Sequence, residues 1–392
     1  MQLASRILQH VRAQESRLLE FLETLVNAES PSAEPRSHAA VRRRFADALR
    51  RIDYRVRDIG PEHGLRHIFA RPQDRESGMR NQLLIGHFDT VWPIGTLQDR
   101  PFAVDGNIVR GPGVFDMKGG LAQIVFALEA IQALGQKPRL APLIFVNSDE
   151  EIGSRSSTRY VRMLARCAER AFVLEPAMGE EGHLKTERKG IGRFTITVFG
   201  KAAHAGLDPE GGASAILELS HVIQKLFALN DPAAGVSVNV GTVDGGIQPN
   251  VIAPHSKAVV DVRVPSLAAG QAIEQAIHGL KPSGSGVRLR VEGRIGRPSM
   301  EATPRNLALW QQAERSGKAL GLELKQARAG GGSDGNTTSQ YTATLDGLGP
   351  VGDGAHAEHE FLYIDKTLER TALLAMLLLE PSLSEGAEEA AS

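Results

Sequence analysis

The stretch LIFVNSDEEIGS, residues 143–154, gives the strongest local signal for the fold. Its first four residues are an unbroken apolar run, which is typical of a buried β-strand. Three acids, Asp149, Glu150 and Glu151, come soon after that run. Because neighbouring carboxylates stay ionised together only near a cation, the stretch suggests a metal site. A solvated acidic turn with Ser154 as the N-cap of the next helix would explain the same residues, so other parts of the chain must distinguish the two interpretations.

Strand-like and helical segments alternate through the first half of the chain. Apolar or alternating runs of strand length occur at residues 54–59, 66–71, 82–85, 140–146 and 171–174. Helical spacing occurs at residues 3–26, 36–51, 119–134 and 156–165, and again at 306–320 and 365–379. This alternation predicts an α/β fold in which helices cover both faces of a mostly parallel sheet. The tail from Ser382 is predicted to be disordered.

The segment between residues 190 and 298 follows another pattern. Residues 193–199 alternate apolar and polar side chains, as a half-buried antiparallel strand does. Strands are expected at 193–199, 236–243, 257–264 and 287–292, and helices at 214–229 and 267–280. The order β-α-β-β-α-β is that of a two-layer, ferredoxin-like α+β unit. We therefore expect a discontinuous larger domain, residues 1–189 plus 299–392, and an inserted domain, residues 190–298.

Composition gives no support for several classes of partner. The chain has 392 residues and a formal net charge of −1, which gives no electrostatic reason to expect nucleic acid or membrane surfaces as partners. No secretory signal peptide is visible at the N-terminus, so we expect a cytoplasmic protein. The single cysteine, Cys167, excludes an intramolecular disulfide. It lies in the stretch 160–170, where the helix expected from residue 156 could continue, so we predict that it packs rather than acts as a nucleophile.

Metal-competent side chains follow three of the expected strands. His87 and Asp89 come after the strand at 82–85, the two glutamates of the acidic stretch after the strand at 140–146, and Glu175 after the next one. Open α/β sheets build their sites at the carboxyl ends of their strands, so these groups are expected near one another. Successive side chains on extended backbone point in opposite directions, so one of the two glutamates could hold a metal while the other faces a water.

Two further candidates lie in glycine-bearing loops. Asp116 opens a helix, where it could also be a simple N-cap, and His356 precedes the last helix. Histidine with Asp and Glu ligands suits zinc, cobalt or manganese, and a two-metal site would activate a water beside an unliganded glutamate acting as general base. The remaining histidines are expected to be solvent-exposed: His10, His38, His63, His67, His183, His221, His255, His278 and His359.

Five motifs resemble, in order and spacing, the co-catalytic zinc family that contains glutamate carboxypeptidase, aminoacylase, acetylornithine deacetylase and succinyl-diaminopimelate desuccinylase. They are GHFDTV (86–91), RGPGVFDMKGG (110–120), SDEEIGS (148–154), LEP (174–176) and GAHAEHE (354–360). Within the family the chain is most similar to glutamate carboxypeptidase, because GKAAHAG, GGIQPNVIAP, GRPSMEA and GGGSDGN also resemble its stretches. The resemblance implies a zinc-exopeptidase-like catalytic domain and an inserted dimerisation or lid domain.

The resemblance assigns the metal ligands residue by residue. It implies that Asp116 bridges two zinc ions, that His87 and Glu175 complete one ion, and that Glu151 and His356 complete the other. Cobalt or manganese could substitute for zinc.

The resemblance also implies catalytic roles for three residues. Glu150 is the general base, and Asp89 orients a ligand histidine through the second ring nitrogen of its imidazole. His204 of the inserted domain reaches across a homodimer interface and stabilises the oxyanion in the other subunit.

The substrate contacts are expected from the inserted domain and one loop. Asn250 and Arg297 match positions that bind the substrate's terminal carboxylate, a task that suits the planar guanidinium. Arg263 could do the same or only pair with Asp261. The glycine loop is a further candidate through Gly331, Ser333 and Asp334.

The expected reaction is hydrolysis of an amide bond that releases a C-terminal amino acid from a peptide or an N-acyl amino acid, and the resemblance favours glutamate. A deacylase acting on N-acetyl or N-succinyl amino acids by the same mechanism is the alternative. A catalytically silent binding protein of the same fold ranks lower, because every ligand type is retained. A two-metal phosphoesterase is disfavoured because no basic cluster accompanies the motifs.

Overall fold

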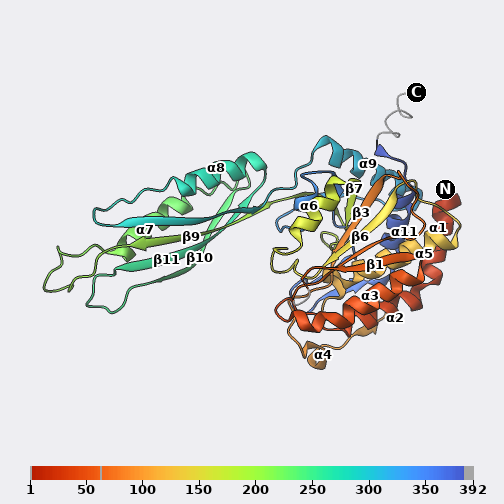
Figure 1. The fold of residues 1–392 in the computed structure, drawn as a ribbon, viewed down its shortest axis with the longest axis horizontal. Coiled ribbons are helices and arrows are strands. Elements are labelled where there is room, and N and C mark those ends of the chain that lie inside the picture. Colours follow the sequence, from red (N-terminus) through yellow and green to blue (C-terminus); the bar gives the residue numbers. More distant parts are fainter. Residues whose placement is uncertain (1, 62–63, 384–392) are drawn as a thin grey trace. The chain divides into compact units, whose positions relative to one another are not determined.

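The computed structural model describes residues 2–61 and 64–383 (Figure 1). The chain divides into two compact units. The larger unit comprises residues 1–186, 302–328 and 333–392, and the smaller unit comprises residues 187–301 and 329–332. The smaller unit is thus inserted in the sequence of the larger one. Of the tail predicted to be disordered from Ser382 onward, residues 384–392 lie outside the described residues.

The central sheet of the larger unit is mixed. Its strands lie in the order β1 (Tyr54–Ile59), β2 (His67–Pro72), β6 (Ala141–Asn147), β3 (Asn81–His87), β7 (Ala168–Val173) and β14 (Ala343–Leu345). The strands from β6 to β14 are parallel, whereas β1 and β2 form an antiparallel edge beside β6. The connection between β1 and β2 is too short for the crossover that parallel neighbours need, which explains why these two strands run antiparallel to each other. The predicted α/β class is confirmed.

Helices cover both faces of this sheet, as predicted. Along β3 and β6, successive side chains join different apolar cores: Leu84 and Ile144 pack in one, Ile85 and Phe145 in the other. Helix α6 packs in the second core, and α1, α2, α3, α5, α9 and α11 pack in the first. The helical segments of this unit are α1 (Gln2–Ala13), α2 (Glu15–Val26), η1 (Pro35–His38), α3 (Ala39–Arg51), α4 (Thr96–Asp99), η2 (Val114–Lys118), α5 (Gly119–Ala133), α6 (Thr158–Arg166), α9 (Pro304–Ala319), α10 (Gly335–Thr338) and α11 (Ile364–Leu379).

A small antiparallel sheet brings two loops of the larger unit together. Its order is β15 (Gly352–Asp353), β16 (Phe361–Tyr363), β5 (Ile108–Arg110) and β4 (Ala103–Asp105). Because Phe361 pairs with Arg110, the loop that precedes β16 lies beside the glycine turn that follows β5. A separate two-stranded sheet pairs β13 (Gln326–Ala329) with β8 (Leu184–Arg188).

The smaller unit has the predicted β-α-β-β-α-β order. Its elements are β9 (Gly190–Phe199), α7 (Ala215–Phe227), β10 (Ser237–Gly245), β11 (His255–Val264), α8 (Leu267–His278) and β12 (Arg288–Arg297). The strands form one antiparallel sheet in the order β10-β11-β9-β12. On β9, Phe194, Ile196 and Val198 point into a core shared with both helices, as the alternation of the sequence predicts. The hydroxyls of Ser214 and Ser266 cap α7 and α8.

Three expectations for single residues were wrong. Cys167 is exposed at the C-terminal end of α6, because the helix ends at Arg166 rather than continuing over the cysteine. His38 and His67 are buried instead of exposed, since each finds a hydrogen-bond partner inside the larger unit. His63 lies outside the described residues. Among the helices of the described residues, none combines the length and apolar character that crossing a membrane requires.

Candidate metal centre

The carboxyl ends of three adjacent parallel strands carry the first candidate ligands. His87 is the last residue of β3, which lies between β6 and β7 in the sheet. Glu150 and Glu151 follow the end of β6, and Glu175 follows the end of β7. Strand order therefore places acids on both sides of the histidine, as expected at such an edge.

Asp116 and His356 reach the same place from loops. The His87 Nε2 atom lies 3.2 Å from Asp116 Oδ1 and 3.4 Å from Glu175 Oε1. The His356 Nε2 atom lies 3.0 Å from Glu151 Oε2 and 3.5 Å from Asp116 Oδ2. Asp116 thus turns one carboxylate oxygen toward each imidazole. The structure brings together all five side chains expected to bind metal.

Two overlapping groups of side chains could each hold an ion. One consists of His87, Glu150 and Glu175, and the other of His87, Asp116 and Glu151, with ligand atoms within 4.8 Å of one another. Zinc binds nitrogen and oxygen at about 2.0–2.2 Å, so ligand atoms on one ion lie at most roughly 4.4 Å apart, and only small shifts separate these groups from such a site. Glu150 is near enough to reach the same ion as Glu175.

The donor set fits a metal. Within the described part of the chain, Asp116 Oδ1 and Glu151 Oε1 are buried oxygens without a hydrogen bond of acceptable geometry. Buried carboxylate oxygens without donors are costly, and a cation would remove that cost. Imidazole and carboxylate without thiolate are the ligands expected for zinc, cobalt or manganese.

The acids and histidines shift one another's protonation. Burial lowers the pKa of His87, but the carboxylates around it, led by Asp116, outweigh burial and hold that pKa well above its usual value. Hydrogen bonds with Asp116 and Glu151 raise the pKa of His356 to about 10. Burial raises the pKa of Glu151 to about 7 and also raises the pKa of Glu175. In the metal-free protein, protonated groups therefore supply the positive charge that bound ions would supply.

A model of peptidase family M20/M25/M40 matches residues 83–380, the part of the chain that holds all of these side chains. The chain belongs to this family. Carboxypeptidase G2 of Pseudomonas sp. strain RS-16 is 28% identical over 380 residues, which cover 93% of this chain and 89% of that protein. Succinyl-diaminopimelate desuccinylase of Delftia acidovorans is 27% identical over 370 residues, which cover 89% of this chain and 94% of that protein. The protein is therefore a hydrolase of the M20 peptidase and deacylase type.

Solved structures show the same fold for this M20 protein. Aminopeptidase PepT of Bacillus cereus superposes with a TM-score of 0.76 at 19% identity, covering 94% of this chain and 99% of that chain. A tripeptidase of Staphylococcus aureus superposes with a TM-score of 0.74 at 19% identity, covering 93% and 97%. The combination of a larger α/β unit with an inserted α+β unit is thus that of M20 peptidases.

Asp89 contacts the site in two ways. Its backbone oxygen lies 2.9 Å from His87 Nδ1, closer than its carboxylate, which is 3.5 Å from that nitrogen. The carboxylate instead accepts the amides of Glu150 and Glu151, each at 3.2 Å, and the hydroxyl of Ser32 at 2.7 Å. Although burial raises the pKa of Asp89, its interactions, led by that with the nearby His87, lower it below the usual value. Asp89 therefore holds the acidic stretch as well as the histidine.

Asp149, the remaining acid of the stretch, has a structural role. Asp149 is buried, and its carboxylate accepts the amides of Ser156 at 2.6 Å and Ser157 at 3.3 Å. It therefore closes the turn that leads from β6 into α6.

The glycine loop packs against the acidic stretch from the other side. Asp334 is buried and accepts hydrogen bonds from the Asn147 amide and, at 2.6 Å, from the Ser154 hydroxyl. Ser333 is also buried and donates to Asp346 at 2.5 Å. Both side chains face the protein interior, so the prediction that this loop binds substrate now depends on the exposed Gly331.

The other predicted substrate residues belong to the smaller unit. His204 is exposed, and its Nδ1 accepts the amides of Gly206 and Leu207 at 3.1 and 3.2 Å. Asn250 is exposed and Arg297 is half-buried. The roles of these three residues stay predictions. Arg263 pairs with Asp261 at 2.8 Å, the simpler of its two expected roles.

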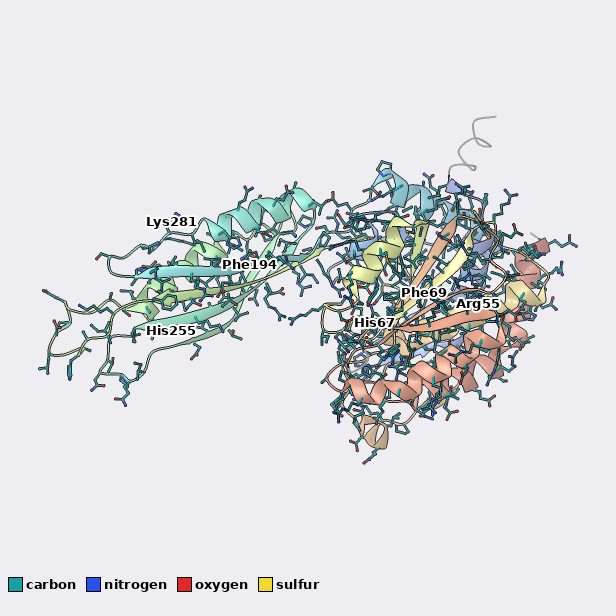
Figure 2. The ribbon with its side chains drawn as sticks, in the orientation of Figure 1. Arg55, His67, Phe69, Phe194, His255 and Lys281 are labelled. Carbon is teal, nitrogen blue, oxygen red and sulfur yellow. The ribbon has the colours of Figure 1, made fainter. Side chains whose placement is uncertain are left out.

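Two buried side chains near the candidate metal centre were not expected from the sequence. His67, at the start of β2 (Figure 2), has its Nδ1 3.3 Å from the Ser148 amide and its Nε2 3.1 Å from the Ser156 hydroxyl. Glu360 is buried four residues after His356. A histidine that opens a strand, or a glutamate within GAHAEHE, gives no local signal of burial; only the contacts of the folded chain reveal it.

Proposed function

We propose that this M20 protein is a two-zinc hydrolase that releases a C-terminal amino acid, with glutamate as the first candidate, from a peptide or an N-acyl amino acid. The observation that carries the proposal is Asp116, whose two oxygens face His87 and His356 separately. A carboxylate in that position can bridge two ions. The similarity to carboxypeptidase G2 over 93% of the chain supports the carboxypeptidase reaction.

The proposed ligands divide into two sets around Asp116. His87 and Glu175 would hold one ion, and Glu151 and His356 the other. Bound zinc would supply a Lewis acid for the scissile carbonyl and lower the pKa of a bound water. Cobalt or manganese would offer the same ligand chemistry.

Glu150 carries the proton in this proposal. It lies beside Glu151 in sequence and within reach of His87 and Glu175, and Asp89 fixes its backbone amide. As general base, Glu150 takes a proton from the attacking water and then gives it to the leaving nitrogen, so that the released amine departs neutral. One carboxylate thus serves both halves of the reaction.

The inserted domain, residues 190–298, is proposed to dimerise. Exposed large apolar side chains are numerous in the smaller unit, and its strand β10 lies at an edge of the sheet. Such side chains and an open strand edge favour association with another copy. They are Leu207, Ile216, Leu217, Phe227, Val243, Ile247 and Leu267.

In that homodimer, His204 of the partner subunit would stabilise the oxyanion. Asn250 and Arg297 would bind the terminal carboxylate of the substrate. The guanidinium of Arg297 offers two parallel N–H groups for this purpose.

The experiment that tests this function compares kcat/KM of the zinc-loaded protein on N-acyl-glutamates, C-terminal glutamyl peptides and N-acetyl-ornithine. Preferred turnover of the glutamate substrates is expected. Preference for N-acetyl-ornithine or N-succinyl substrates would establish the deacylase alternative, which the desuccinylase relative supports. If the loaded protein left a broad panel of N-acyl amino acids and dipeptides untouched, a binding role would replace both.

A further inference from the structure

We propose that Glu360 is a positioning residue that sets the orientation of Asp116, and through it the spacing of the two proposed metal positions. The inference rests on the proposed two-metal function, which assigns Asp116 as the bridge. Glu360 Oε1 accepts the backbone amides of Phe115 at 3.0 Å and Asp116 at 3.1 Å. Its Oε2 accepts the amide of Gly113 at 2.8 Å and the indole N–H of Trp92 at 2.7 Å.

The place of Glu360 in the fold makes it a link between two ligand loops. It stands directly before β16, which pairs with β5, and β5 leads into the loop that carries Asp116. It also follows His356 by four residues, and its own amide closes that turn by donating to Ala357 O at 3.1 Å. One buried carboxylate therefore ties the loop of the proposed bridge to the loop of a proposed histidine ligand.

The backbone around Asp116 is irregular, so its position depends on contacts from outside the turn. Asp116 has φ −114° and ψ 96°, and Met117 has φ −132° and ψ 36°, so neither continues the turn η2 in helical geometry. Gly113 has φ +76°, a left-handed conformation. Two backbone hydrogen bonds, Val114 N to Gly111 O and Lys118 N to Gly113 O, close the turn, and the three amides held by Glu360 add contacts at and next to Asp116 itself.

A carboxylate suits this role better than an amide. The four groups that meet Glu360 are all N–H donors, and a carboxylate only accepts. In Glu360→Gln, the side-chain NH₂ would face at least one pair of these donors, with almost no change in volume. Glu358 offers a matched control, since it lies in the same turn and is exposed.

The test measures metal binding apart from turnover. Full-length wild type, Glu360→Gln and Glu358→Gln are stripped with a chelator, reloaded with zinc, dialysed and analysed for bound metal, and the cobalt-loaded forms are compared by visible absorption. We expect Glu360→Gln to bind at least one ion roughly 10- to 100-fold more weakly, as other losses of groups that orient ligands do, with an altered cobalt spectrum. Glu358→Gln should match wild type.

Wild-type metal affinity, stoichiometry and cobalt spectrum in Glu360→Gln would overturn the proposal. If that variant fails to fold by circular dichroism, Trp92→Phe decides instead, because it keeps an aromatic side chain and removes the indole N–H donor. Unchanged zinc affinity and an unchanged cobalt spectrum in Trp92→Phe would also overturn the proposal. Failure of the proposed function gives another result than failure of this proposal. Wild type would then bind two ions yet cleave no amide. The effect of Glu360→Gln on metal binding would still be measurable in that case.

Discussion

The carboxylate of Asp89 accepts a hydrogen bond from the backbone amide of Glu150 at 3.2 Å. Asp89 is a buried acid that follows β3, and it thereby fixes the backbone of Glu150, the proposed base that follows the neighbouring strand β6. In Asp89→Asn, the side-chain NH₂ would face one of the two amides that the carboxylate now holds. We expect kcat to fall roughly 10- to 100-fold with a smaller change in KM, and zinc affinity to fall as well, measured by steady-state kinetics and metal analysis. Wild-type kcat in a correctly folded variant would contradict this role.

Glu150→Gln should separate metal binding from chemistry. The amide cannot take the proton of the attacking water, yet it keeps the size of the side chain. We expect two bound ions and a loss of kcat of about 10²–10⁴-fold, with an unchanged metal content checked on the same sample. Turnover similar to wild type would remove Glu150 from the base role, and loss of an ion would make it a ligand instead.

Loading the metal-free protein with zinc near pH 7 should release protons. The raised pKa values keep His87 and His356 protonated at this pH and Glu151 partly protonated, and each must lose its proton to bind an ion. Calorimetric titrations in buffers of different ionisation enthalpy would count the protons. An observed enthalpy that does not depend on the buffer would show that no net protons leave, and would contradict the raised pKa values of these groups in the metal-free protein.

Removing the metals should also change how stability depends on pH. For the metal-free protein, the folded-state pKa of His356 is raised to about 10, so its contribution is present below about pH 6.5 and is lost as the pH rises toward 10. We expect the Tm of the metal-free protein to fall over this range more than that of the zinc-loaded protein. Parallel curves from differential scanning calorimetry would contradict this expectation.

His67 should make the fold sensitive to acid. Burial lowers its pKa below the usual value, and its Nδ1 lies against the amide of Ser148, so a proton there would place two N–H groups face to face. The unfolded chain takes up this proton at higher pH than the folded one, so stability present above about pH 6.5 is lost as the pH falls through the lowered pKa. The fall in Tm between pH 6.5 and 5 should be shallower in His67→Gln than in wild type or in the control His10→Gln; equal slopes would contradict it.

The sequence best predicts the proximity of site residues that follow neighbouring parallel strands. His87, Glu151 and Glu175 come after buried apolar runs, and parallel strands align their ends, so their proximity follows from the pattern. Asp116 and His356 are 240 positions apart in irregular loops, and only the family resemblance joined them in advance. Burial of side chains outside regular patterns depends on distant partners, which explains why the positions of His38, His67 and Glu360 could not be inferred locally. The antiparallel edge strands, by contrast, could have been inferred from their short connection.

The proposed dimer makes a prediction that depends on both subunits. His204→Ala should lower kcat more than it weakens ground-state binding, because an oxyanion donor acts in the transition state. In a hybrid of His204→Ala with Glu150→Gln, one site combines an intact Glu150 with an intact His204 of the partner subunit, while the other site lacks both. Random exchange of equal amounts makes half of the dimers hybrid, so about a quarter of wild-type activity should return. Each variant incubated alone is the control, and light scattering with a mass-tagged subunit verifies exchange. No recovery after verified exchange would place His204 outside a shared site.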